Sequence, residues 1–319
     1  MIVRAIRPEE KELYNSVVRH PLQSWEWGEF RAQTGQKVER VGLFQSGKLA
    51  QAFQVTFHEL PLIGGTVGYW PKGSIPTSEH SAILKELGKN NNAVFIKIEP
   101  NEPSSPDTIN FLLSQDFVPG RPLFTKYTFQ LDLKPSEETL FANLESKTRY
   151  NVNLSYKKGV RIFENSTQDG LETHLKILAE TTSRQGFYAH GPEYFRSMWQ
   201  SLAESGMMHI LEARLEETVL VSWILFQFND VLYYPYGASS SENRNVMASN
   251  LMMWEAIKFG QAKGCTLFDM WGSLGPDPDT TSSWYGFHRF KKGYGGDLVE
   301  FIGTFDLPLD FPSTKYLAF

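Results

Sequence analysis

The sequence predicts a mixed α/β protein in which two domains follow one another with the same order of strands and helices. Three observations lead to this prediction. The length of 319 residues suits two domains of ordinary size, and a hydrophobic content of 41% is enough for two sizeable cores. Strand and helix patterns in the second half repeat those of the first. A charged stretch containing Pro135 separates the two halves.

The first half is predicted to begin with two helices, at 8–18 and 24–33. Pro8 suits the first turn of a helix, and Ser24 is a typical N-cap. Alternating patterns then predict two strands joined by the Ser46-Gly47 turn, followed by a third. The elements expected in this half, in order, are helices 8–18 and 24–33, strands 38–44, 49–57 and 66–70, helix 78–87, strand 93–99, helix 107–114 and strand 123–133.

The second half shows the same sequence of patterns after three predicted helices. These helices are expected at 137–157, 170–185 and 192–204. They are followed by strands 208–215, 219–228 and 231–239, a helix at 248–264 and a strand at 265–272. An antiparallel meander that continues through a helix into a parallel strand is the layout of GNAT-type acyltransferases. We therefore predict two tandem GNAT-like domains, at 1–134 and 135–303, with the tail 304–319 packed back on the first.

Composition limits the classes of partner and site. The net charge of −5 and a pI near 5.9 mean that any nucleic-acid contact must come from a local basic patch. We expect a cytoplasmic protein without a membrane-spanning segment, because no apolar run reaches about 18 residues. Cys265 is the single cysteine, so no internal disulfide can form, and no Cys or His pair has metal-ligand spacing. We expect no metal.

Two basic stretches stand out in this acidic chain. The stretch SKTRYNVNLSYKKGVRI (146–162) contains five cations and no acid. It is either a solvated helix face or a nucleic-acid footprint. The stretch FHRFKKGYGG (287–296) places His288, Arg289, Lys291 and Lys292 among aromatic residues before a glycine turn. It is either a solvated strand end or a set of cations held for an anion or for charge that develops in a reaction.

Other residue patterns carry weaker indications of chemistry. Tyr194 and Tyr236 either line a ligand pocket or are half-buried packing residues. The loop before the helix at 248–264 precedes a potential anion-binding helix N-terminus. An acyl-coenzyme A enzyme of the GNAT class would be expected to show R-x-x-G-x-G/A there, whereas this chain has SSSENRNVMAS. No order of Ser, His and Asp and no carboxylate pair indicates a hydrolytic site.

Seven stretches together resemble the Fem family of peptidoglycan bridge-forming aminoacyltransferases, and they occur in family order across nearly the whole chain. They are LQSWEWGEFR, AVFIKIEP, SKTRYNVNLSYKKGV, SRQGFYAHGPEYF, YYPYGASS, NLMMWEAIKFGQAKGCTLFDMWG and the FK and GYGG of the second basic stretch. The resemblance implies two GNAT-like domains. The chain has no room for the long helical coiled-coil arm of some members, so it resembles the arm-less type.

The resemblance also implies a reaction and its partners. Fem enzymes take an amino acid from aminoacyl-tRNA and join it to an amine of a cell-wall precursor, so we expect aminoacyl-tRNA as co-substrate and no other cofactor. The acceptor is expected to be UDP-MurNAc-pentapeptide, as for the arm-less type, or a lipid-linked precursor. We expect a monomer.

Individual residues take their expected roles from the positions that match the family. Lys291 and Phe290 match a catalytic Phe-Lys pair. In the acceptor site Arg31 stands where a lysine is usual, Glu99 where an aspartate is usual and His190 where an arginine is usual. The full expected acceptor set is Arg31, Glu99, Tyr188, His190, Tyr194 and Tyr236, and the expected tRNA set is Lys147, Arg149, Lys157, Lys158 and Lys292.

Two other functions stay open at this point. One is an N-acyltransferase of the GNAT type that uses an acyl-coenzyme A, which the missing pyrophosphate loop disfavours. The other is a non-catalytic tandem GNAT module that binds RNA or a nucleotide sugar.

Overall fold

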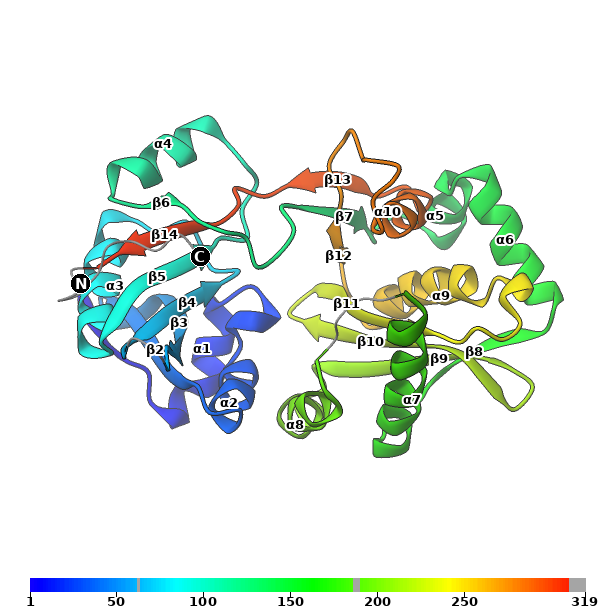
Figure 1. The fold of residues 1–319 in the computed structure, drawn as a ribbon, viewed down its shortest axis with the longest axis horizontal. Helices are drawn as coiled ribbons and strands as arrows, with labels where there is room; N and C mark the ends of the chain where they lie inside the picture. Colours follow the sequence, from blue (N-terminus) through cyan, green and yellow to red (C-terminus); the bar gives the residue numbers. More distant parts are fainter. Residues whose placement is uncertain (62–63, 186–189, 310–319) are drawn as a thin grey trace. The chain divides into compact units, whose positions relative to one another are not determined.

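The structure, a computed structural model, describes residues 1–61, 64–185 and 190–309, which form two compact units. The first unit consists of Met1–Lys126 and the segment that begins at Glu300, and the second of Tyr127–Val299 (Figure 1). Each unit contains one seven-stranded sheet. None of the described helices is both long and apolar enough to cross a bilayer.

The sheet of the first unit has the strand order β1-β2-β3-β4-β5-β14-β6. Only β4 and β5 pair in parallel, and α3 connects them. Thr77 and Ser105 cap α3 and α4 by accepting backbone N–H groups. The strands are β1 (Ile2–Ala5), β2 (Lys37–Gln45), β3 (Lys48–Glu59), β4 (Thr66–Pro71), β5 (Ala93–Glu99), β6 (Val118–Pro119) and β14 (Phe305–Pro308); the helices are η1 (Pro8–Glu10), α1 (Lys11–Val17), η2 (Pro21–Gln23), α2 (Trp25–Gln33), α3 (Ser78–Asn90) and α4 (Pro106–Ser114).

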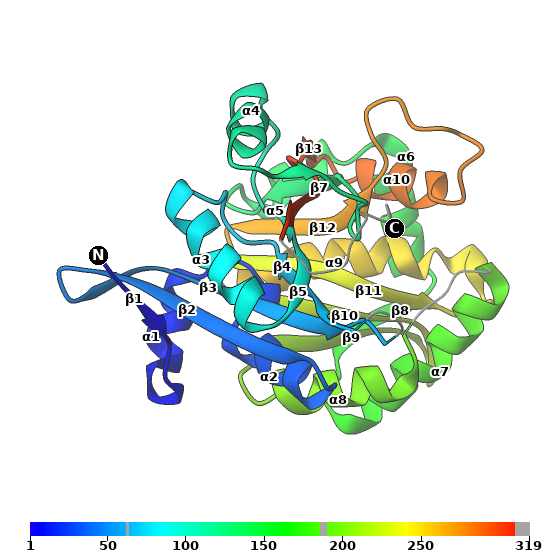
Figure 2. The ribbon, with the colours of Figure 1, turned by 60° about the vertical axis from the view of Figure 1, so that its left-hand side comes forward.

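The sheet of the second unit has the order β13-β7-β12-β11-β10-β9-β8. Helix α9 lies over one face of this sheet, and α7 and α8 cover the other (Figures 1 and 2). The strands are β7 (Tyr127–Asp132), β8 (Val160–Glu164), β9 (Met208–Leu215), β10 (Thr218–Phe228), β11 (Val231–Ser239), β12 (Leu267–Ser273) and β13 (Asp297–Glu300); the helices are α5 (Glu137–Asn143), α6 (Ser146–Lys157), α7 (Gln168–Gln185), α8 (Pro192–Leu202), η3 (Arg244–Val246), α9 (Ala248–Ala262) and α10 (Tyr285–Lys292).

The predicted repeat is confirmed. The elements β2-β3-β4-α3-β5 of the first unit have the same order as β9-β10-β11-α9-β12 of the second, and both series end in a parallel strand pair. The longest described helix, α7, has 18 residues, so the described part of the chain contains no long helical arm. The fold class is therefore the predicted one.

The first sheet includes a strand from the C-terminal end of the chain, and the second sheet includes a strand that the sequence assigned to the first half. Strand β14 lies between β5 and β6, with Phe305 opposite Ile98, and β7 lies beside β12, with Leu131 opposite Phe268. The predicted strand 123–133 therefore belongs to the second sheet instead of completing the first half. The unit boundaries fall at 126/127 and 299/300, whereas the sequence placed them after 134 and 303. Of the tail 304–319, residues 310–319 lie outside the described residues.

One local prediction was wrong, and one of two alternatives for a basic stretch is excluded. The helix predicted at 137–157 is two helices, because Leu144 and Glu145 are extended, with ψ near 147° and 146°, and the Leu144 side chain is buried. The basic stretch at 287–296 is not a strand end, since its first half belongs to helix α10. This second difference matters for the site, because the helix determines which cations are buried.

Candidate active site

The parallel strands of the second unit separate near their carboxyl ends. β11 and β12 pair only at Val231, Leu232 and Tyr233. Tyr236 and Gly272 each lie three residues beyond the last pair, Tyr233 with Asp269. In the first unit, by contrast, β4 and β5 stay paired as far as Pro71 and Glu99. Ligands of α/β sheets bind at the carboxyl ends of parallel strands, so this separation marks the candidate site.

Lys291 is buried beside the separated end of β12. Its side chain is 6% exposed, and Nζ donates to the Gly272 carbonyl at 2.7 Å. Nζ also lies 5.6 Å from the centre of the Tyr234 ring. Among the described residues no carboxylate comes within 4 Å of this cation. Burial lowers the pKa of Lys291 to about 8, and the charge of Asp269 partly offsets that effect.

An irregularity in β12 turns the Gly272 carbonyl toward Lys291. The pairing of β12 with β7 shifts register between Asp269 and Gly272, and Trp271 has a φ of 63°. The buried carboxylate of Asp269 holds this bulge, because it accepts hydrogen bonds from Thr128 Oγ1 at 2.7 Å, Gln130 Nε2 at 2.9 Å and the Trp271 amide at 2.7 Å. The bulge thus gives the lysine one neutral acceptor.

Phe290 carries a main-chain carbonyl at the end of the same helix. The amides of Gly293, Tyr294 and Gly295 donate to the carbonyls of Arg289, Lys291 and Lys292, respectively. None of these three amides therefore donates to the Phe290 carbonyl. The Phe290 ring packs edge-on against Tyr294 and Trp223, with centroids 5.4 and 6.4 Å away. These contacts fix the end of the helix, and the Phe290 carbonyl can still accept a hydrogen bond from a substrate.

The glycines after α10 allow the close packing that positions Lys291. A Cβ at Gly293 would lie 2.3 Å from Thr148 Oγ1 on α6, and one at Gly296 would lie 2.9 Å from the Gln130 carbonyl. Gly295 has a φ of +78°, a conformation that favours glycine. The Glu145 amide donates to the Gly293 carbonyl at 2.9 Å. The start of α6 and the end of α10 are therefore in direct contact.

Substitution of the glycine that follows α10 and of a glycine within it should have opposite effects. We expect Gly293→Ala to destabilise the protein by roughly 1–3 kcal/mol through overpacking and to lower activity by displacing Lys291. Gly286→Ala should instead stabilise it by up to about 1 kcal/mol, because nothing lies within 4 Å of that position and alanine favours helix. Urea unfolding of both variants measures this. Equal effects of the two changes would contradict the packing argument, and Thr148→Ala should restore stability to the Gly293 variant.

The candidate acceptor residues of the second unit lie around Phe195. Tyr194 and Tyr236 both pack edge-on against its buried ring, with centroids 5.7 and 5.0 Å away. The exposed His190 stacks on Tyr194 at 3.8 Å. The structure therefore brings these three predicted residues together on one aromatic cluster. Tyr188 lies outside the described residues.

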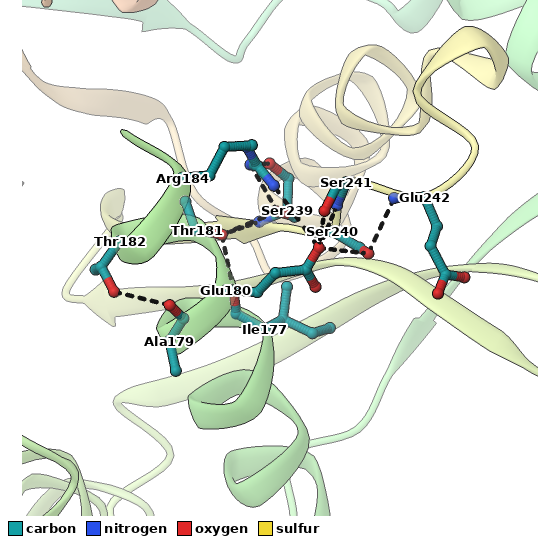
Figure 3. Close-up of polar contacts among 10 residues, drawn as sticks. All are labelled: Ile177, Ala179, Glu180, Thr181, Thr182, Arg184, Ser239, Ser240, Ser241 and Glu242. Atoms are coloured by element: carbon teal, nitrogen blue, oxygen red, sulfur yellow. Dashed lines mark hydrogen bonds and ion pairs between the residues drawn. The ribbon is translucent and has the colours of Figure 1, made fainter. Parts of the chain in front are cut away.

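A group of hydrogen bonds, called the latch below, joins Glu180, Thr181 and Arg184 near the end of α7 to residues 239–241 at the end of β11 (Figure 3). Glu180 accepts the Ser241 amide at 2.6 Å and the hydroxyl groups of Ser240 and Ser241. Arg184 donates to the Ser239 carbonyl at 2.8 Å, and Thr181 accepts the Ser239 amide at 2.9 Å. The latch fixes the loop between Tyr236 and α9, at the position where a GNAT enzyme is expected to bind a pyrophosphate.

Arg31 and Glu99 belong to the first unit and act on the same tyrosine. Glu99 is 4% exposed and accepts the Tyr69 hydroxyl with one oxygen. Its other oxygen accepts the amides of Leu123 and Phe124 at 2.8 and 3.2 Å and the Thr304 hydroxyl at 2.6 Å. Burial and the charge of Glu99 raise the pKa of Tyr69 well above its ordinary value, and the charge of the half-buried Arg31 offsets part of this rise.

The predicted tRNA residues fall into two kinds. Lys147, Lys157, Lys158 and Lys292 are exposed, as is Arg289. Arg149 is half-buried and donates to the carbonyls of Ala142, at 2.7 Å, and Leu144, so its guanidinium caps the end of α5. The contact between α6 and α10 places the start of the basic stretch 146–162 next to Gly293 in the basic stretch 287–296.

Known proteins match this chain along most of its length. An acetyltransferase (GNAT) domain model matches residues 145–290. The crystal structure of FemX matches with a TM-score of 0.87 and 22% identity over 98% of both chains. Lipid II:glycine glycyltransferases of Staphylococcus haemolyticus and Staphylococcus aureus (strain USA300) are 25% and 24% identical over 93% of this chain and 90% of theirs. The chain is similar to Fem-type transferases over nearly its whole length.

The length of these matches agrees with the arm-less form. The alignment with the Staphylococcus haemolyticus protein spans 386 positions, more than the 319 residues of this Fem-like chain, so the relative contains residues that are absent here. The FemX match covers both chains almost completely.

Sequence reasoning missed two groups in the Fem-like site. Asp269 was a detectable signal, since it is a single carboxylate within the otherwise apolar stretch LFDMW. Glu180 was not detectable, because it lies on a charged helix and its partners are about 60 residues away in the sequence.

Proposed function

We propose that the chain is an aminoacyltransferase that moves an amino acid from aminoacyl-tRNA to an amine of the stem peptide of a peptidoglycan precursor. One observation carries the proposal: similarity to lipid II:glycine glycyltransferases extends over 93% of the chain. The basic stretches on α6 and α10 support tRNA as the donor, because an acidic protein needs such a local patch to bind phosphates. The product is a precursor whose added amino acid becomes part of the interpeptide bridge of the cell wall.

The reaction exchanges an ester for an amide. The acceptor amine attacks the ester carbonyl carbon, a C–N bond forms, and the bond from that carbon to the ribose oxygen breaks. The attacking nitrogen loses one proton and the ribose oxygen gains one. Because the ester is already activated, the enzyme needs to align the reactants, stabilise the oxyanion and move that proton.

Lys291 and Phe290 supply groups for these tasks. Lys291 is protonated in most molecules at pH 7, since its pKa is about 8, and its cation can stabilise the oxyanion or the departing oxygen. A cation is most effective in a site that excludes water, and this one is 6% exposed. The Phe290 carbonyl can accept a hydrogen bond from an N–H of the attacking amine, whose nitrogen gains positive charge as the C–N bond forms.

The acceptor carries its MurNAc-peptide on a diphosphate in either of its two sources, UDP-linked or lipid-linked. As the resemblance implies, we assign Arg31 and His190 to that diphosphate and Tyr194 and Tyr236 to the remainder of the acceptor. His190 in place of arginine gives a weaker phosphate contact, because a neutral imidazole cannot form the bidentate contact of a guanidinium. The names of the curated relatives favour lipid II, and the assay below separates the two sources.

The latch argues against an acyl-coenzyme A donor. Glu180 already takes the Ser241 amide and two serine hydroxyls at the loop before α9. A pyrophosphate bound there would lose these donors and would face a carboxylate.

Transfer can be tested directly by mass spectrometry. The purified protein is mixed with a pool of charged tRNAs and with either UDP-MurNAc-pentapeptide or lipid II, and a parallel reaction contains acetyl-coenzyme A. One added amino-acid residue on either precursor supports the proposal and identifies its acceptor. Acetyl transfer without aminoacyl transfer would replace it with the acyl-coenzyme A function. Binding of tRNA without any transfer would favour the non-catalytic module.

The pH dependence of transfer should reveal the charge on Lys291. If its cation is the active form, the single-turnover rate falls as pH rises through about 8, where the lysine loses its proton. The Lys291→Arg variant should be slower but should lack this descending limb, because arginine stays protonated. The ionisation of the acceptor amine affects the pH profiles of the wild type and the variant equally, so it cancels in the ratio of the two rates. A constant ratio between pH 6.5 and 9.5 would exclude the cation as the active form.

A further inference from the structure

Two large aromatic side chains are exposed at the start of the helix that carries Lys291, one at its N-cap and one in its first turn. Trp284 is 45% exposed and Phe287 is 40% exposed. Their rings touch edge to face, with centroids 6.3 Å apart and planes at 63°. The Trp284 amide donates to the Ser282 hydroxyl at 3.2 Å, which fixes the start of α10. The mechanism above uses neither side chain.

These aromatics lie on the same side of α10 as Lys291. Residues 284, 287 and 291 are three and four positions apart, so they follow one stripe of the helix. At 1.5 Å per residue, Phe287 lies about 6 Å and Trp284 about 10 Å from Lys291 along the helix axis. A stacked strand advances about 3.4 Å per nucleotide, so these distances correspond to about two and three nucleotides.

The charges around the pair favour an anionic strand. The stretch 284–296 contains Arg289, Lys291 and Lys292 and no acid. Asp279, in the preceding loop, accepts the amide and hydroxyl of Thr281 at 2.8 and 2.7 Å. Exposed aromatic rings beside arginine and lysine are the combination that proteins use to bind single-stranded nucleic acid by stacking its bases.

We propose that Trp284 and Phe287 form a stacking platform for the unpaired 3′ nucleotides of the donor tRNA. This inference rests on the proposed function, since it takes the reacting ester to be the one at the tRNA terminus. The ester must reach Lys291, so the nucleotides just before it pass along α10, where the two rings lie. The platform positions the donor and takes no part in bond making.

Binding to two RNA hairpins tests the platform without relying on catalysis. One hairpin ends in an unpaired ACCA overhang, and the other has the same stem and a blunt end. The wild-type protein should bind the overhang hairpin more tightly. Trp284→Ala and Phe287→Ala should each weaken that binding about 5- to 100-fold and leave blunt-end binding unchanged. Phe287→Tyr, which keeps an aromatic ring, should bind like the wild type.

Two further variants make the result specific. Phe111→Ala removes an aromatic of similar exposure, 37%, from α4 of the first unit, and it should change neither affinity. Lys147→Ala should weaken the binding of both hairpins equally, because a contact with a backbone phosphate does not depend on the unpaired bases of the overhang. Thermal melting of each variant checks folding, which truncation of exposed rings should preserve.

The outcomes separate this inference from the proposed function. A protein that transfers amino acids but shows no overhang preference, or loses affinity for both hairpins equally in the Trp284 and Phe287 variants, would overturn the platform and leave the function standing. If the protein shows the predicted overhang binding but no transfer in the mass-spectrometric assay, the platform would be supported and the proposed function would be contradicted.

Discussion

Replacing Lys291 by methionine is expected to lower the single-turnover rate of transfer about a hundred- to a thousandfold. Methionine keeps most of the length of the side chain and removes its charge, so the oxyanion loses a stabilising cation in a buried site. Rapid mixing of enzyme, acceptor and charged tRNA measures this rate. Lys176→Met, an exposed position on α7 that has no part in the site, is the matched control and should retain the wild-type rate.

The same substitution should not destabilise the protein. Burial lowers the pKa of Lys291 from its ordinary 10.5 to about 8, so the folded state at pH 7 carries a cation that would be about 3 kcal/mol more stable in the unfolded chain. This penalty disappears as pH rises from about 8 to above 10, because the unfolded lysine then loses its proton as well. Methionine removes the penalty at all pH values.

Thermal melting between pH 7 and 10 therefore distinguishes catalysis from folding. The Lys291→Met variant should melt at or above the wild-type temperature at pH 7, and its advantage should shrink toward pH 10. A variant with full activity would remove Lys291 from the mechanism. A variant that is slow and also melts well below the wild type would mean that its loss of rate reflects a damaged fold.

Replacing Glu99 by alanine is expected to destabilise the protein by roughly 3 kcal/mol or more. The change leaves four donors around this buried carboxylate without their acceptor: the hydroxyls of Tyr69 and Thr304 and the amides of Leu123 and Phe124. Urea unfolding measures the loss. Tyr69→Phe removes one of these four hydrogen bonds and should cost about 1 kcal/mol.

This prediction also separates two roles for Glu99. A carboxylate that acts on the acceptor would, when removed, raise KM and leave the unfolding curve in place. The four hydrogen bonds indicate that its main role is to hold residues 123–124 and the start of the C-terminal segment on the sheet of the first unit. An unchanged unfolding midpoint with a raised KM would instead support the substrate role that the sequence implied.

The order of elements could be predicted because its signals are local. Alternation marked each strand of the repeat, and Ser46-Gly47 marked the first hairpin. The sheet that β7 joins could not be predicted in the same way, and the prediction that the tail 304–319 packs on the first domain did not include a strand there. Leu131 and Leu307 are both buried apolar residues in short strands, and such a pattern does not reveal which sheet a strand joins.

The candidate site was predictable in residue type but not in environment. The resemblance drew attention to Lys291, yet its burial follows from α10 being a helix and from a bulge held by Asp269, which are tertiary features. Arg149 gives the opposite case. It lies in a basic stretch, but two main-chain carbonyls hold its guanidinium, and sequence spacing does not show such a contact.

The position of β14 near the end of the sequence also determines the order in which the two sheets can be completed on the ribosome. All strands of the second sheet come from residues 127–300, so that sheet can form once this continuous stretch has been synthesised. The first sheet lacks β14 until residues 305–308 follow, and until then the edge of β5 is unpaired and β6 has no neighbour. The half of the protein that is synthesised first is therefore the half whose sheet closes last.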